Sequence, residues 1–152
     1  MPELRGAELL EYQPNRYPFL MIDVVSDFSP GVFARGHKNL TNNEWFFPEH
    51  FPGNPNMPGA LQLEAMAQML TVAITTIDGL KGAVTHAIEH RVRFRQEVVP
   101  GDCLVVETQV VSWKRGICRG TAQCLVDGNL VSDAEMVITI PEILQSHLPN
   151  RA

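Results

Sequence analysis

One apolar stretch constrains the fold of this chain more than any other feature. Residues 60–76 read ALQLEAMAQMLTVAITT, and in a helix their apolar side chains would cover nearly the whole circumference, with Glu64 as the single charge. Pro58 just before the stretch favours a helix start, and Gly79 just after it favours a stop. A helix that is apolar almost all round is buried in the protein. The sequence therefore predicts one central buried helix.

A membrane-spanning helix is the alternative for such an apolar segment. The segment is short, it carries Glu64 and Gln68 internally, and no basic residues flank its N-terminal side. We therefore predict a buried helix of a water-soluble domain and no membrane partner.

The polar residues of the predicted helix form a single stripe. Glu64, Gln68, Thr71 and Thr75 are spaced i, i+4, i+7 and i+11. Burying an unpaired carboxylate is costly, so Glu64 must be partnered, kept protonated or open onto a cavity.

The loop ahead of the helix, residues 48–59, is rich in proline and glycine and carries His50. Such a loop tends to hold one conformation. A fixed imidazole and a shielded carboxyl suit general acid–base chemistry, and the free N–H groups near Gly59 at the helix start could bind a carbonyl oxygen. Together they suggest proton abstraction next to a carbonyl. A loop histidine and a satisfied buried carboxylate without catalytic roles remain the alternative.

The rest of the chain is predicted to be mainly β-structure. A short amphipathic helix is expected over residues 2–11, and the strands are expected over residues 19–28, 32–40, 84–94, 103–113, 117–126 and 129–140, the last ended by Pro141. Asp127-Gly128 is a strong hairpin signal. The four later strands are expected to form an antiparallel meander. A buried helix then needs either a sheet wrapped around it or a sheet on one side and a second subunit on the other.

Composition narrows the class of protein. The 152 residues are 45% hydrophobic, which is enough for one domain (1–152), and the net charge of −5 with a pI near 5.5 argues against a nucleic-acid binder. Cys103, Cys118 and Cys124 lie in strand-like runs and are expected to be core thiols. The start of the sequence does not resemble a signal peptide, so a cytoplasmic location is expected. The histidines lack a metal-ligand spacing, and no metal is expected.

Several motifs together resemble one enzyme family. HFPGNPNMPG followed by LQLEAMAQ is similar to the signature of the 3-hydroxyacyl-acyl carrier protein dehydratases (FabZ type, with FabA as the related branch). The resemblance extends to NRYPFLMIDVV, VRFRQEVVPGDCLVVE and RGICRGTAQCLVDGNLVSDAE. It implies an α+β hotdog fold, in which a curved antiparallel sheet wraps a long central helix. It also implies a homodimer, or a trimer of such dimers, with two active sites at the interface.

The resemblance also implies residue roles in fatty-acid or polyketide-type biosynthesis. His50 of one subunit would remove the C2 proton of a (3R)-3-hydroxyacyl thioester, and Glu64 of the other would protonate the departing C3 hydroxyl. The Gly59 N–H would polarise the thioester carbonyl, and Gln68 would orient the carboxyl of Glu64. The substrate would be held on the phosphopantetheine of an acyl carrier protein, with no further cofactor. Glutamate at position 64 favours the simple dehydratase, because the isomerising branch usually has aspartate.

The sequence departs from this family near the expected mouth of the substrate tunnel. His90 stands where an acidic residue is usual, Ile88 where glycine is usual, and Asn15 where histidine is common. The connection over residues 78–85 is also short. These changes bear on acyl-chain length and substrate identity more than on the chemistry.

Basic residues suggest a surface for the carrier protein. Arg91, Arg93 and Arg95 alternate along a predicted strand, and Lys114 and Arg115, with Arg119, would extend the patch. The alternative is a solvated strand face with ion pairs to Glu89, Glu97 or Glu107. The aromatic run Trp45-Phe46-Phe47 is expected to pack in the core or the dimer interface rather than to gate the substrate. The helix residues Met66 and Met69 are expected to lie in the core, and the alternative is that some of them line an acyl tunnel.

Two other functions remain open at this point. A hotdog thioesterase would use the helix carboxylate to activate water and would not need His50 in a rigid loop. A non-catalytic acyl- or carrier-protein-binding module would retain the fold without the chemistry. The presence of both His50 and Glu64 argues against the binding module.

Overall fold

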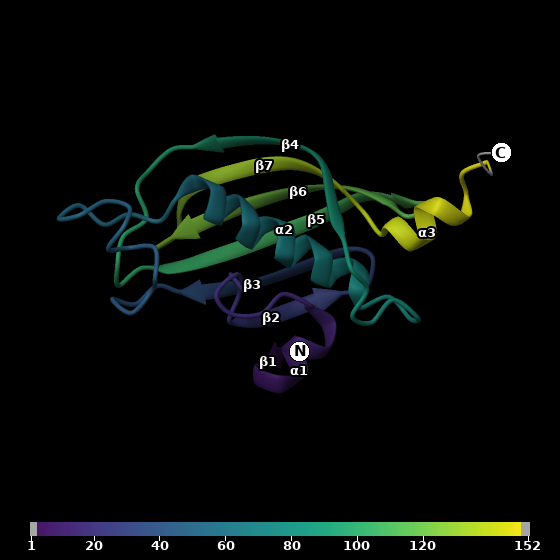
Figure 1. Cartoon of the computed structure of the whole chain (residues 1–152), viewed down its shortest axis with the longest axis horizontal. Helices are drawn as coiled ribbons and strands as arrows, with labels where there is room; N and C mark the ends of the chain where they lie inside the picture. Colours follow the sequence, from purple (N-terminus) through teal and green to yellow (C-terminus); the bar gives the residue numbers. More distant parts are fainter. Residues whose placement is uncertain (1–2, 150–152) are drawn as a thin grey trace.

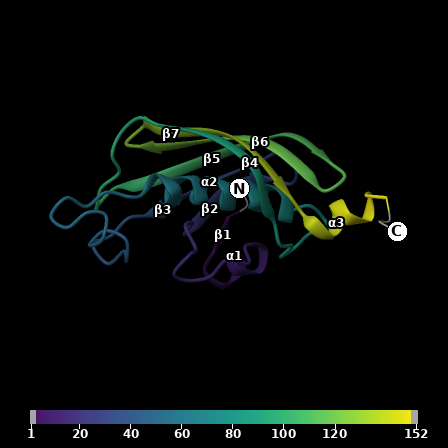
Figure 2. The ribbon, with the colours of Figure 1, turned by 45° about the horizontal axis from the view of Figure 1, so that its top comes forward.

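One helix lies across one face of an antiparallel sheet (Figures 1 and 2). The computed structural model describes residues 3–149. Within these residues the sheet has seven strands in the order β1-β2-β3-β5-β6-β7-β4, and every neighbouring pair is antiparallel. The elements are β1 (Leu4–Arg5), α1 (Gly6–Tyr12), β2 (Val24–Ser29), β3 (Phe33–Asn39), α2 (Gly59–Thr75), β4 (His86–Phe94), β5 (Cys103–Lys114), β6 (Ile117–Val126), β7 (Asn129–Thr139) and α3 (Pro141–Ser146).

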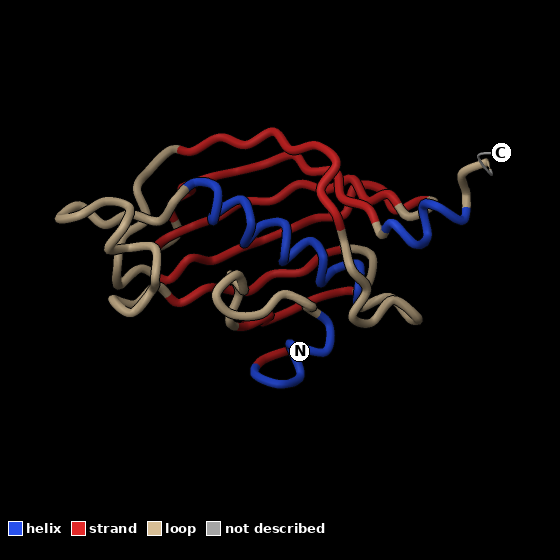
Figure 3. The backbone as a smooth tube through the Cα atoms, in the orientation of Figure 1, coloured by secondary structure: helices blue, strands red, loops and turns tan. Residues whose placement is uncertain are grey.

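The order of the strands corrects the predicted four-strand meander. Of the four strands predicted for it, only β5, β6 and β7 form consecutive hairpins, whereas β4 pairs with β7 at the far edge and β5 pairs with β3. The reason is α2, which carries the chain across the sheet between β3 and β4 (Figure 3). The predicted hairpin between β6 and β7 is present, with Asp127 and Gly128 at φ values of 50° and 78°.

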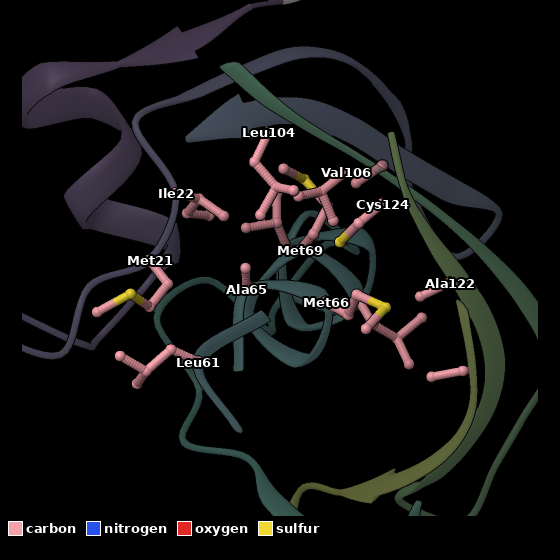
Figure 4. Packing of buried hydrophobic residues seen from close by; sticks show 14 of the residues in the cluster. Met21, Ile22, Leu61, Ala65, Met66, Met69, Leu104, Val106, Ala122 and Cys124 are labelled. Carbon is pink, nitrogen blue, oxygen red and sulfur yellow. The ribbon is translucent and has the colours of Figure 1, made fainter. Parts of the chain in front are cut away.

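The core lies between α2 and the inner face of the sheet. Figure 4 shows Ala65, Met66 and Met69 of α2 surrounded by side chains from β5 and β6, including Leu104 and Cys124. Met66 and Met69 are fully buried, as predicted. Burial of this apolar surface is the main favourable contribution to folding.

The N-terminal helix is shorter than predicted. Residues 1 and 2 lie outside the described part of the chain, Leu4 and Arg5 form β1, and the helix begins at Gly6. Gly6 has a φ of 53°, which is left-handed and does not continue a right-handed helix toward the N-terminus. Leu4 and Leu9 still bury their side chains, as the apolar pattern indicates.

The strand predicted over residues 19–28 begins only at Val24. The segment before β2 is bound instead by the side chain of Gln68, which accepts a hydrogen bond from the Met21 N–H at 2.7 Å and donates to the Phe19 carbonyl at 2.7 Å. These backbone groups are therefore not available for a sheet ladder.

The aromatic run ahead of the loop packs largely as predicted. Phe46 and Phe47 are buried, whereas Trp45 is 40% exposed and donates its indole N–H to the Pro18 carbonyl. At the other end of the chain, Pro141 ends the last strand as predicted but also begins α3, which the sequence analysis did not include.

The first half of α2 is open on one side, whereas every side chain from Gln68 to Thr75 is buried. Ala60 is exposed, and Leu63, Glu64 and Ala67 are partly exposed, so these residues form an open strip along the side away from the sheet. The edge strand β4 is also exposed over most of its length. Of the two predicted arrangements, a sheet that wraps the helix completely is therefore not observed, and a sheet on one side with a second subunit on the other stays a prediction. No helix between residues 3 and 149 combines the length and apolar character needed to cross a bilayer.

The three cysteines do not all lie in the core. Cys118 and Cys124 are buried, and burial raises the pKa of each thiol to about 12. Cys103 is exposed, because it is the first residue of β5 and points away from the core. Partial burial, followed by the nearby Asp23 and Asp127 carboxylates, raises the pKa of its thiol.

These environments predict how the thiols react. At pH 8 a disulfide reagent should modify Cys103 alone, and slowly, because only the thiolate reacts and the raised pKa keeps its population small. Spectrophotometric titration of the native protein should count one thiol, and titration in guanidinium should count all three. Rapid modification of all three thiols in the native protein would contradict the described packing.

Candidate active site

A groove surrounds the N-terminus of α2. Pro58 caps the helix without a side-chain hydrogen bond, and the carbonyl of Pro58 takes the N–H groups of Leu61 and Gln62. The N–H groups of Gly59 and Ala60 have no hydrogen-bond partner among the described residues. They open into the groove, which Asn56, Phe94 and Arg95 also line.

Glycine at the first position of α2 leaves room for the ring of Phe94. A Cβ atom on Gly59 would lie 2.6 Å from the ring of Phe94, closer than side-chain atoms approach one another. The Phe94 ring therefore packs directly on the helix start. This close contact fixes the relation between the end of β4 and the free N–H groups of α2.

The loop between β3 and α2 holds His50 by its backbone and its ring. The His50 N–H donates to the Phe46 carbonyl at 3.0 Å, and the His50 carbonyl accepts from the Asn56 N–H at 2.8 Å. The ring atom Nδ1 lies 2.9 Å from the Asn56 carbonyl oxygen. A carbonyl only accepts, so Nδ1 carries the proton and Nε2 of the neutral ring is a free base.

Glu64 is half-buried on the open strip of α2, where Gln68 holds its carboxyl. Gln68 donates its Nε2–H to Glu64 Oε1 at 2.9 Å. The same amide also binds the backbone of Phe19 and Met21, so Gln68 uses both N–H donors and its oxygen. The predicted support of Glu64 by Gln68 is therefore present as a contact. Of the three alternatives for this carboxylate, a hydrogen-bonded partner is the one observed.

Gln13 is a site residue that the sequence analysis did not single out. It is fully buried, its Nε2 donates to the Gln68 carbonyl at 3.2 Å, and its Oε1 accepts two hydrogen bonds from Asn15 at 2.9 and 2.8 Å. Arg16 in turn donates to the Gln13 carbonyl at 2.7 Å. Gln13 thus fixes the N-terminal segment against the helix turn that carries Gln68. A polar residue in a turn-rich connector gives no sequence signal for such a role.

His50 and Glu64 do not contact each other through a hydrogen bond within one chain. The bonds of His50 go to its own loop, and that of Glu64 goes to Gln68. The loop projects past the end of the sheet where α2 begins (Figure 1). Within one chain, His50 and Glu64 are therefore held by different hydrogen-bond partners.

The basic residues fall into two groups at opposite ends of the sheet. Arg91 and Arg95 pair with Glu135 and Asp133 on β7, at 4.0 and 3.0 Å, and not with the predicted Glu89, Glu97 or Glu107. Arg93 lies between them on the same face, and the described residues offer it no ion pair.

The second basic group is remote from the first. Lys114 and Arg115 lie at the turn after β5, where Ile117 pairs with Thr139 and Thr139 pairs with His86. His86 and Phe94 are the two ends of β4, so the length of this strand separates the groups. The structure does not bring the five predicted docking residues into one patch.

The described residues form no evident metal-binding site. Between residues 3 and 149, no three histidine, cysteine or carboxylate side chains gather closely enough to hold a metal ion.

Solved structures share this fold. The dehydratase heterocomplex ApeI:P from Xenorhabdus doucetiae has a TM-score of 0.77 and 14% identity, over 90% of this chain and 93% of that chain. Zebra fish thioesterase superfamily member 2 has a TM-score of 0.66 and 13% identity, over 87% of this chain and 90% of its own. At these identities the similarity establishes the fold alone, and it confirms the predicted α+β hotdog fold.

Sequence comparison is more specific. The 3-hydroxyacyl-[acyl-carrier-protein] dehydratase FabZ of Clostridium novyi is 41% identical over 134 residues, which cover 88% of this chain and 94% of that protein. FabZ of Caldicellulosiruptor bescii is 44% identical, over 88% of this chain and 96% of the relative. A family model described as a FabA-like domain matches residues 13–135, a range that holds His50, Gly59, Glu64 and Gln68. The chain therefore belongs to the FabA-like domain family, as its motifs indicate.

Proposed function

We propose that this protein dehydrates a 3-hydroxyacyl thioester, carried by an acyl carrier protein, to the trans-2-enoyl thioester. The observation that supports this proposal most directly is a pair of side chains: the imidazole of His50, whose Nε2 is available as a base, and the carboxyl of Glu64, which Gln68 orients. The FabZ names of relatives that are 41% and 44% identical support the reaction and the carrier.

The geometry supports a simple division of labour. His50 Nε2 removes the C2 proton while the N–H groups at Gly59 stabilise the negative charge that develops on the thioester oxygen. Glu64, in its protonated form, gives its proton to the C3 hydroxyl, which leaves as water. The elimination places one proton on His50 and takes one from Glu64, so a proton transfer back to Glu64 restores the enzyme. Gln68 acts as a positioning residue for the carboxyl.

Each active site of this proposal is completed by two subunits. The open strip of α2 and the exposed edge of β4 leave one side of Glu64 uncovered, and the loop that holds His50 projects away from its own chain. A two-fold homodimer places the loop of one protomer against the helix of the other. Trimers of such dimers are compatible with the same arrangement.

Removing either half of the site should abolish dehydration. His50→Ala loses the base and Glu64→Gln loses the acid, and each change should lower kcat at least about 100-fold. The assay follows enoyl absorbance from a 3-hydroxyacyl thioester and free thiol in parallel. Native-level enoyl formation in both variants would refute the assignment, and release of thiol by the native protein would indicate a thioesterase.

Mixing the two inactive variants tests the shared site. Half of randomly assembled dimers contain one chain of each variant, and one of their two sites then has both His50 and Glu64 intact. Co-refolding His50→Ala with Glu64→Gln should restore roughly a quarter of native activity. If both residues of a site came from one chain, every hybrid site would carry a defect and no activity would return.

The arginines near the groove offer a surface for the carrier protein. Within the described residues Arg93 makes no ion pair and lines a hollow on the outer face of the sheet, and Arg95 lies at the rim of the groove that contains Gly59. A phosphate group and an acidic carrier protein suit such a surface. Lys114 and Arg115 are remote from the groove, so we restrict the docking proposal to Arg91, Arg93 and Arg95.

A charge reversal tests this surface. Arg93→Glu should raise KM for the carrier-bound substrate several-fold, because like charges then face each other, while KM for a short pantetheine thioester should stay near the native value. Arg115→Glu, the same reversal at the far end of the sheet, is the matched control and should leave both values unchanged. An equal change for both substrates in Arg93→Glu would remove the docking role.

A further inference from the structure

His90 lies on the inner face of the edge strand. It pairs with Met136 of β7, and Val92 pairs with Ala134, both of which are buried partners that face α2. Glu89 and Arg91 on either side therefore face outward. His90 thus places an imidazole toward the helix, at a position where the family resemblance leads one to expect a carboxylate.

The position of His90 along α2 follows from two contacts. At one end Phe94 packs on Gly59, and at the other the hydroxyls of Thr71 and Thr85 are 2.8 Å apart. The stretch between these contacts runs alongside β4 in the opposite direction. His90 lies about 13 Å along β4 from Phe94 and is therefore level with the helix turn at Gln68, at the far end of the open strip that contains Glu64.

The ring of His90 has an unmet hydrogen-bonding atom. Within residues 3–149, three buried side-chain polar atoms lack a partner: Gln62 Oε1, His90 Nδ1 and Ser132 Oγ. Gln62 lines the groove at the start of α2, and Ser132 pairs with Phe94. All three atoms thus lie between α2 and the β4–β7 pair. Buried polar groups without partners are rare, and leaving one unpaired is costly.

We infer that His90 binds an oxygen substituent on the acyl chain of the substrate, so that the preferred substrates are oxygenated 3-hydroxyacyl thioesters rather than plain alkyl ones. This inference rests on the proposed dehydratase function. The thioester is bound at Gly59 and C3 faces Glu64, so the rest of the chain continues along the open strip. His90 lies four residues from Phe94 on β4, about 13 Å away. The recognised group therefore lies on the outer half of a medium-length chain.

The chemistry of this contact favours a hydroxyl or a keto oxygen. Nδ1 of the neutral imidazole donates in one tautomer and accepts in the other, and a hydroxyl group matches either. An alkyl chain at the same place leaves the buried atom unpaired. A site built to hydrogen-bond a substrate group discriminates strongly against the analogue that lacks it.

The test compares substrates on the same enzyme variant. The probes are 3-hydroxybutyryl, 3-hydroxydodecanoyl, and 3,9- and 3,11-dihydroxydodecanoyl pantetheine. The variants are His90→Leu, which removes the hydrogen bond, His90→Asn, which keeps one, and Val111→Ala, a control on β5 at a side chain that is 68% exposed. Damage to folding affects all probes of one variant alike, so the ratio of kcat/KM between long probes isolates the contact.

The native enzyme should favour one dihydroxy probe at least tenfold over the alkyl probe of equal length. His90→Leu should reduce this ratio to one or below, whereas His90→Asn should retain most of it and Val111→Ala should match the native enzyme. Turnover of the butyryl probe, which is too short to reach His90, should stay native-like in all variants. Calorimetric binding of the long probes should give the same ratios without turnover.

Two results would overturn the inference. One is a native ratio near one by kinetics and calorimetry, and the other is a ratio that His90→Leu leaves unchanged. In the second case, a change of oligomeric mass in His90→Leu would assign Nδ1 to a subunit interface instead. Failure of the native enzyme to dehydrate the butyryl probe would refute the proposed function instead, and the calorimetric ratio would still decide the role of His90.

Discussion

The side-chain amide of Gln68 connects the core to the candidate site. Its oxygen accepts from Met21 and its two N–H groups donate to Phe19 and Glu64, so turning the amide over would break all three hydrogen bonds. The N-terminal segment is thereby fixed to α2, and the carboxyl is held on the open strip. Because the amide is almost completely buried, water cannot replace these bonds, and the position of Glu64 depends on the packing of the segment before β2.

Local sequence patterns were sufficient to predict most of the helices and strands, but not the order of the strands in the sheet. Apolar periodicity located α2 and β5 to β7 within one or two residues, because those elements form from local patterns of burial and turn residues. The edge position of β4 depends on the side of the sheet to which α2 carries the chain, and no local sequence pattern encodes this. The late start of β2 depends on Gln68, 47 residues from Met21 in sequence.

The same distinction holds for the site. His50, Glu64 and Gln68 could be selected from the sequence because a polar residue is conspicuous in a proline-rich loop or an apolar helix. Gln13 was missed, because its role depends on a contact 55 residues away. The basic patch was predicted as one surface because alternation along β4 is readable, whereas the remote position of Arg115 follows from the strand order.

The exposed edge of β4 has a consequence for handling this protein. An unpaired strand edge can add strands from any chain, and Ile88 and Phe94 offer apolar side chains there. Charged Glu89, Arg91 and Arg93 interrupt this edge and act as gatekeepers against indiscriminate pairing. We therefore expect a monomer whose β4 edge is not covered by another subunit to aggregate slowly through this strand. Aggregation should be faster at high ionic strength, because salt screens the protective charges.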